Sequence, residues 1–176
     1  MPPPSLTLPS WAVDEAILDH IEALVPPDTN QGAITLMPFK LTKDQQAEAN
    51  SLATLAWDAH SELNEAIVEA AGLANPTEAK PALTAETKAN LEILRHVLVD
   101  RVQDCTAFAQ RLGDEWRNEW NEKSERWQEG ENGSKAEDFI SEWENFEPDV
   151  EELDWNDLAE IDPGPIEDFE ALPESA

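Results

Sequence analysis

The chain has 176 residues, of which 39 are acidic and 11 are basic, so its formal net charge is −28 at neutral pH. This excess of negative charge repels the phosphates of DNA, RNA and anionic membranes, and we expect none of them to bind directly. The expected partner is a basic protein, and nucleic-acid-binding proteins are the largest class of these.

The amino-terminal part of the chain predicts two different segments. Residues 1–9 contain four prolines and are typical of an extended, disordered lead-in. A helical domain is expected over residues 10–147, beginning with a short helix at Trp11–Val25 that Ser10 can cap and Pro26 ends. Residues 31–41 carry no charge before Lys40, and we expect an extended packing segment there.

A long helix is predicted to begin after Thr42, because Thr42 and Gln45 match a capping box. It should run to Ala71 and end at Gly72, a residue suited to a left-handed C-cap. Leucine and alanine recur along it at alternating steps of four and three, at Leu52, Ala56, Ala59, Leu63, Ala66, Ala70 and Leu73. This heptad seam predicts close packing against a second helix.

Residues 84–128 predict that second helix, with Thr84 as its N-cap and Gly113 as its only glycine. Its apolar residues recur at steps of three or four, at Leu91, Leu94, Leu98, Val102, Cys105, Ala109, Leu112, Trp116 and Trp120. Two seams joined by a short connection predict an all-α fold built on a long antiparallel, coiled-coil-like hairpin of residues 42–73 and 84–128. The same seam would also support a homodimer that forms a four-helix bundle.

Past Gly130 and Gly133, which should end the long helix, a short helix is expected with Ser134 and Glu137 as a second capping box. Residues 148–176 then form an acidic–aromatic tail with weaker signals of order. Residues 136–176 hold 16 acidic residues and no Lys, Arg or His. Bulky apolar residues are interleaved with the acids, at Val150, Leu153, Trp155, Leu158, Ile161, Ile166, Phe169 and Leu172. We therefore expect short segments that dock on this protein or on a partner.

Signatures of catalysis and of cofactor binding are missing from the sequence. It has no GxGxxG, GxxxxGK or GxSxG pattern, and its one cysteine rules out CxxC zinc sites and an intramolecular disulfide. Glu92 and His96 lie one turn apart, but Arg95 occupies the histidine position of the Glu-x-x-His pattern of ferritin-like metal sites. We therefore predict no enzyme activity, no cofactor and no metal.

Tryptophan is the unusual component, with seven residues and no tyrosine. One interpretation is a small core in which Trp116, Trp120 and Trp143 close the end of the hairpin. The other is that some rings anchor an Arg- and Lys-rich surface, since an acidic residue directly precedes four of them.

Two functions fit this charge pattern. The first is a DNA mimic that occupies the nucleic-acid-binding groove of a basic protein. In charge, though not in any shared motif, the chain resembles DNA-mimic inhibitors of restriction enzymes, CRISPR effectors and other defence nucleases. The residues expected to bind the partner are Asp58, Glu62, Glu65, Glu69, Glu115, Glu119, Glu122, Trp143, Glu151, Glu152, Asp154, Trp155 and Asp157. On the first long helix, the four carboxylates from Asp58 to Glu69 would be spaced about 5.5 Å apart, more sparsely than the ~3.4 Å of one DNA strand.

The second function is an adaptor or chaperone-like protein whose tail binds a basic partner. The two functions differ in which part of the chain binds the partner. A mimic needs the carboxylates on its helices, whereas an adaptor should lose its partner when the tail is removed, although its hairpin stays folded. A third interpretation, adaptation to high salt, is disfavoured because the charge is concentrated toward the C-terminus. The lone cysteine, the lack of a secretory signal in the first residues and the lack of a run of ~20 apolar residues together predict a cytoplasmic protein.

Overall fold

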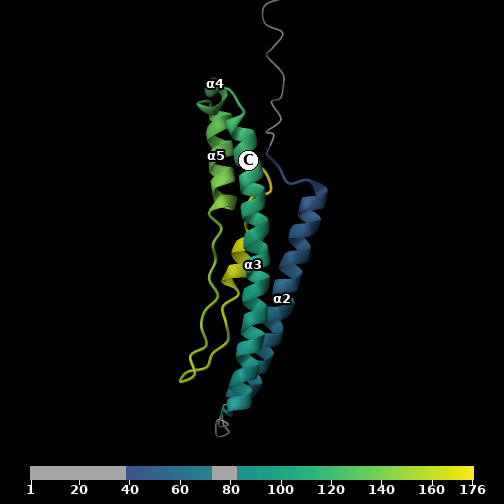
Figure 1. The fold of residues 1–176 in the computed structure, drawn as a ribbon, viewed down its shortest axis with the longest axis vertical. Helices are drawn as coiled ribbons and strands as arrows, with labels where there is room; N and C mark the ends of the chain where they lie inside the picture. Colours follow the sequence, from purple (N-terminus) through teal and green to yellow (C-terminus); the bar gives the residue numbers. More distant parts are fainter. Residues whose placement is uncertain (1–38, 73–82) are drawn as a thin grey trace, which may run out of the picture. The chain divides into compact units, whose positions relative to one another are not determined.

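The structure, a computed structural model, describes residues 39–72 and 83–176. Its helices, in chain order, are α2 (Lys43–Ala71), α3 (Ala85–Asn121), α4 (Glu125–Gln128), α5 (Glu131–Glu144) and α6 (Gly164–Glu170) (Figure 1). The proline-rich lead-in, the predicted helix at 11–25 and nearly all of the connection at 74–83 lie outside the described residues. None of the helices described is both long and apolar enough to cross a bilayer.

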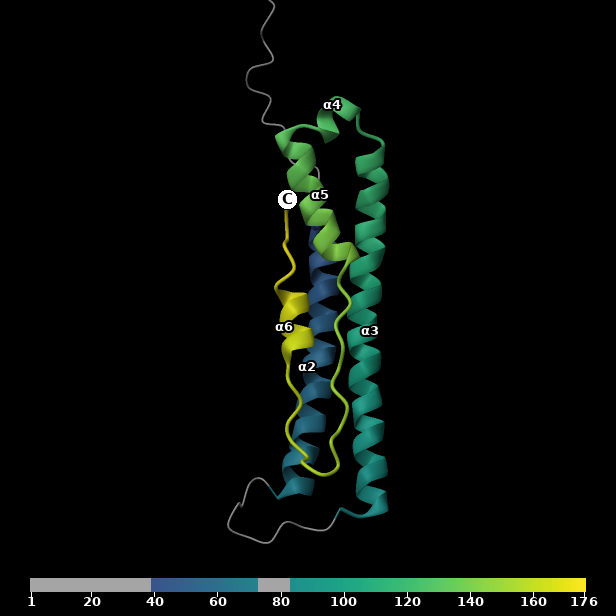
Figure 2. The same cartoon turned by 90° about the vertical axis from the view of Figure 1, so that its left-hand side faces the viewer.

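Helices α2 and α3 lie side by side as an antiparallel hairpin, which confirms the all-α prediction (Figures 1 and 2). The capping box forms as expected, with Gln45 N donating to Thr42 Oγ1 at 3.2 Å and Thr42 N donating to Gln45 Oε1 at 2.9 Å. Gly72 ends α2 in the left-handed conformation at φ 64°, which favours glycine. Thr84 caps α3 by accepting from Thr87 N at 3.1 Å.

The buried stripe of α2 is rotated relative to the predicted seam. Ala56, Ala59 and Leu63 are buried as expected, whereas Leu52, Ala66 and Ala70 are only partly buried. Ile67 and Ala71 are buried instead. A second layer, formed by the C-terminal tail, also packs on α2 through α6.

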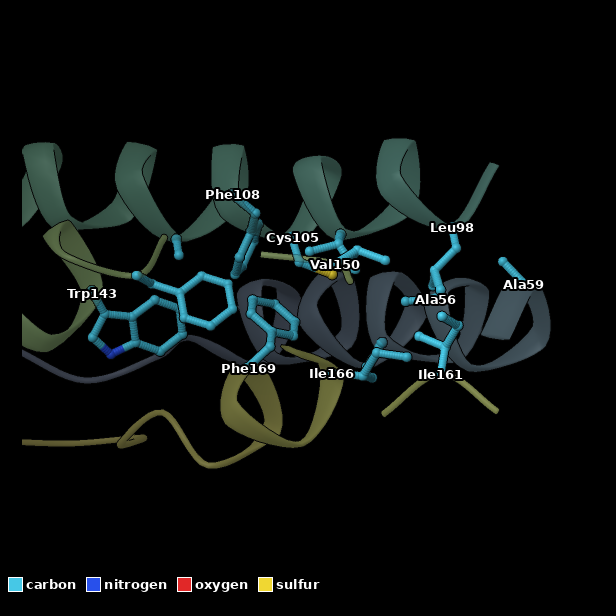
Figure 3. Packing of buried hydrophobic residues seen from close by; sticks show 14 of the residues in the cluster. Ala56, Ala59, Leu98, Cys105, Phe108, Trp143, Val150, Ile161, Ile166 and Phe169 are labelled. Carbon is cyan, nitrogen blue, oxygen red and sulfur yellow. The ribbon is translucent and has the colours of Figure 1, made fainter. Parts of the chain in front are cut away.

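The tail follows the hairpin in both directions. It runs along α3 to a turn and returns along α2 through α6 (Figure 2). Its buried residues join the core of the hairpin: Val150, Leu153, Leu158, Ile161, Ile166 and Phe169. Figure 3 shows Val150, Ile161, Ile166 and Phe169 in this core. Phe169 meets Phe108 of α3 with ring centroids 6.2 Å apart. Of the two docking sites expected for the tail, the structure therefore shows the one on this protein.

The end of the tail also pairs with the segment that precedes α2. Leu41 N donates to Glu174 O at 3.0 Å, and Ala176 N donates to Phe39 O at 3.1 Å. Lys40 and Ser175 form an isolated antiparallel bridge. The extended segment predicted at 31–41, of which Phe39–Leu41 are described, thus finds its partner strand in the last residues of the chain.

The prediction that the second long helix reaches Gln128 is wrong, because α3 ends at Asn121. The chain reverses there, and side chains hold the reversal. Trp120 Nε1 donates to Gly133 O at 3.1 Å, and Gln128 Nε2 donates to Trp120 O at 2.9 Å. Helix α5 begins at Glu131 with Gly130 as its N-cap, so the predicted capping box at Ser134 is also wrong. These tertiary hydrogen bonds outweigh the local helical pattern.

Helix α5 packs against the last turns of α3. The guanidinium of Arg117 forms an ion pair with Glu144, with Nη2 and Oε2 2.7 Å apart. Arg117 donates to the carboxylate of Glu144, and this hydrogen bond raises the pKa of the Arg117 guanidinium above its usual value. The rings of Trp116, Phe139 and Trp143 contact one another, with the Trp116 centroid 4.9 Å from Phe139 and 5.5 Å from Trp143. The core interpretation of Trp116 and Trp143 is therefore confirmed, and Trp120 is partly buried and packs against the same core.

Candidate partner-binding face

The four acidic residues predicted on α2 form one exposed stripe. Asp58, Glu62, Glu65 and Glu69 follow at steps of four, three and four, which places them on one side of the helix. The chain from Asp44 to Gly72 has no lysine or arginine, so nothing on this part of α2 neutralises the stripe.

Beside this stripe, the returning part of the tail is fixed to α2 by polar contacts. Ile161 O lies 2.9 Å from His60 Nε2, and Ile161 N donates to Asn64 Oδ1 at 2.8 Å. Further along, Trp57 Nε1 donates to Glu170 Oε2 at 3.2 Å. These contacts set tail residues 156–170 alongside α2 residues 57–71.

We call the exposed carboxylates of these two segments the α2–tail face. Its members are Asp58, Glu62, Glu65, Glu69, Asp157, Glu160, Asp162, Glu167 and Glu170. In the described parts of the chain, none of these nine residues takes part in an ion pair. Four arginines instead lie along α3, and three of them, Arg101, Arg111 and Arg117, pair with other carboxylates.

The density of charge on the α2–tail face is close to that of DNA. Fourteen residue steps of α2 span about 21 Å at a rise of about 1.5 Å per residue. The nine carboxylates of this face therefore amount to about one charge per 2.3 Å of axis. B-DNA carries one per ~1.7 Å when both strands are counted. The tail thus supplies the charge that α2 alone lacks.

Comparisons with models of protein families, with curated proteins and with solved structures found no match for this chain. The functional proposal therefore rests on the charge and geometry of the molecule itself.

The acidic residues predicted on α3 lie apart from the α2–tail face. Glu48, near the start of α2, contacts Arg111 of α3 at 3.1 Å. Glu115 is therefore level with the first turn of α2, and Glu119 and Glu122 lie beyond that end of the helix. All three are exposed, and Glu115 is 3.7 Å from Arg111. The structure does not bring them together with Asp58–Glu69.

The predicted tail residues lie mostly at the other end of the hairpin. Glu151, Glu152, Asp154 and Asp157 are exposed, and Trp155 is partly buried. The ammonium of Lys88 lies 5.1 Å from the centroid of the Trp155 ring, so this ring already contacts a cation of its own chain.

Trp143 is a correction to the predicted site. Its side chain is 2% exposed and its Nε1 donates to Pro173 O at 3.0 Å. A ring that is buried and fully hydrogen-bonded in the core has no surface to offer to a partner. Trp143 therefore stabilises the fold.

The two histidines of the described residues have local partners. His96 Nδ1 is 2.6 Å from Glu92 O, and His60 contacts Ile161 O as described above. Within residues 39–72 and 83–176, no group of three or more His, Cys, Asp or Glu side chains is arranged to hold a metal ion.

Trp57, Asn64 and Glu160 are parts of the site that the sequence prediction missed. Trp57 and Asn64 lie seven residues apart and so share one flank of α2, between the acidic stripe and the buried stripe. In the sequence alone, this seven-residue spacing does not show that the flank binds another segment. The packing of the tail on α2 shows it.

Proposed function

We propose that this protein is a non-enzymatic inhibitor that mimics DNA. Its α2–tail face occupies the nucleic-acid-binding groove of a basic protein, in particular a nuclease or another effector of defence against foreign DNA. The observation that carries the proposal is the density of unpaired carboxylates on this face, about one per 2.3 Å. A groove lined by Lys and Arg to receive DNA phosphates would meet a similar charge density here.

The arrangement of the tail supports a fixed decoy over a flexible adaptor. Six apolar side chains of the tail are buried against the hairpin, so its carboxylates are displayed from a folded scaffold. A tail that acted as a separate binding motif would have to expose those side chains first. A DNA mimic presents its carboxylates while these apolar side chains stay buried.

Capture from a host lysate, followed by competition, tests the proposal. The immobilised protein should retain a DNA-binding protein that duplex DNA displaces, whereas polyglutamate of equal total charge should displace it poorly. The affinity should fall by more than about tenfold between about 0.05 and 0.2 M salt, because charge contacts dominate binding. Retention that DNA does not affect, or an affinity that salt does not change, would contradict mimicry.

A pair of charge-matched variants locates the binding face. The first replaces Asp58 with Asn and Glu62, Glu65 and Glu69 with Gln. The second removes the same number of charges from α3, replacing Asp100 and Asp114 with Asn and Glu119 and Glu122 with Gln. The α2 variant should lose about tenfold or more in affinity and the α3 variant no more than about threefold, because distant exposed charges are screened. Equal losses would show that only net charge matters.

A further inference from the structure

A surface groove lies between α2 and the returning tail, within the α2–tail face. It has a volume of about 620 Å³, and the residues that matter for its chemistry are Trp57, Asn64, Glu65, Val68, Glu69 and Glu160. Trp57 and Val68 give it an apolar surface, and carboxylates come from both α2 and the tail. No lysine or arginine is among the described residues that line it.

The indole of Trp57 is held in place before any partner arrives. Its Nε1 donates to Glu170 Oε2 at 3.2 Å, and its ring meets the ring of His60 edge-on, at a centroid distance of 5.5 Å and an angle of 87°. A ring that is already fixed loses little conformational entropy on binding. The groove is therefore pre-organised around Trp57.

The carboxylates of the groove are free to accept a cation. Glu65, Glu69 and Glu160 are exposed and form no ion pair within the described parts of the chain. Glu65 and Glu69 are four residues apart on α2, so their side chains lie on the same side of the groove. A complementary ligand has an apolar stem and a cationic head that carries several hydrogen-bond donors.

We propose that this groove binds an arginine side chain of the basic partner. The guanidinium stacks on Trp57 and donates to Glu65 or Glu160. Arginine fits better than lysine because its planar head both stacks on aromatic rings and bonds carboxylates in pairs. A second copy of this chain is a poor occupant, since each copy carries a net charge of −28. The inference rests on the proposed function only in taking the partner to be a basic protein.

A titration with a capped Gly-Arg-Gly peptide, followed by NMR of the tryptophan indole N–H signals, tests the groove directly. The Trp57→Phe variant identifies the Trp57 signal. We expect a saturable shift of that signal with a dissociation constant on the order of millimolar, as suits one side chain. Gly-citrulline-Gly, which keeps the shape of arginine without the charge, should cause no shift, and Gly-Lys-Gly should bind more weakly.

Variants then assign the contacts. The Glu65→Gln/Glu160→Gln double variant should weaken arginine binding about fivefold or more, and the charge-matched Asp100→Asn/Asp114→Asn variant of α3 should leave it nearly unchanged. Equal binding of citrulline or lysine, or equal shifts of all indole signals, would overturn the inference.

The inference and the proposed function fail in different ways. If the peptide does not bind but DNA still competes for the captured partner, the groove is not an arginine site and mimicry stands. If the peptide binds Trp57 but DNA does not compete, mimicry fails and the arginine site remains.

Discussion

The side chain of Asn64 pairs with both backbone polar groups of Ile161. Its Oδ1 accepts from Ile161 N at 2.8 Å, and its Nδ2 donates to Ile161 O at 3.1 Å. The backbone N–H and C=O groups of an α-helix are already paired within the helix, so they are not free to bond the tail. The Asn64 side chain provides the donor and the acceptor that a neighbouring strand would provide in a sheet. This pair fixes where the returning tail meets α2, and with it the relative position of the two acidic segments.

Replacing Asn64 with Ala should loosen the tail from α2. The substitution leaves Ile161 N–H without its partner, and we expect a loss of about 1–3 kcal/mol in the free energy of unfolding, measured by urea denaturation. Amide hydrogen exchange of residues near Ile161 should become faster. Asn118→Ala, at an exposed position on α3, is the control and should change stability by less than about 0.5 kcal/mol. Unchanged exchange near Ile161 would show that apolar packing alone holds the tail.

Removing residues 148–176 should unfold the hairpin. Six buried side chains leave the core with this segment, and each contributes about 1.5–3 kcal/mol, so the total rivals the ~5–15 kcal/mol stability of a typical domain. The loss of the tail carboxylates relieves some repulsion, but exposed charge pairs contribute only about 1 kcal/mol or less each. Circular dichroism during urea titration should show no cooperative transition for a chain that ends at Glu147. A truncated chain that still unfolds cooperatively would restore the adaptor hypothesis.

Gly113→Ala should destabilise the protein, although this change usually stabilises a helix. An added Cβ would lie 3.0 Å from Glu144 N and 3.1 Å from Glu144 Cα, which are backbone atoms of α5 that cannot move alone. The overpacking cost of about 1–3 kcal/mol exceeds the helix-propensity gain of about 1 kcal/mol. Thermal unfolding should therefore show a lower Tm for this variant. A Tm higher than that of the unaltered protein would mean that α5 does not approach α3 this closely.

Cys105 should react slowly with thiol reagents while the protein is folded. Burial, with a contribution from the charge of Asp104, raises the pKa of its thiol to about 11 from 9.0. At about pH 8 the reactive thiolate is then roughly a hundredfold scarcer than in the unfolded chain, and limited access slows the reaction further. A colorimetric thiol assay in buffer and in concentrated urea measures the difference. Equal rates would show that Cys105 is accessible.

The raised pKa of the Cys105 thiol should also make the folded protein less stable at high pH. A pKa raised by folding contributes stability below the unfolded pKa, and this contribution is lost as pH rises from 9.0 toward about 11. The free energy of unfolding should fall more steeply over this range than in a Cys105→Ala variant. Parallel pH profiles would rule out the shifted thiol as the cause.

The local elements of the hairpin follow from the sequence. Thr42 with Gln45, Gly72 and Thr84 mark three helix ends by interactions that reach only three or four residues, and the structure has all three ends where the pattern predicts them. The apolar period of each helix likewise predicts the hairpin. Helix capping and apolar periodicity depend only on residues a few positions apart, so both can be recognised in the sequence.

Tertiary contacts decided the rest. The end of α3 at Asn121 depends on Trp120 reaching Gly133. The local pattern also does not predict that Ile67 is buried while Ala66 is only partly buried. The acidic content of α2 and of the tail is plain in the sequence, but their alignment into one face depends on Asn64 and Ile161, which are 97 residues apart. A local pattern cannot encode which distant segments share a surface, because that choice is made by the burial of apolar side chains from all of them at once.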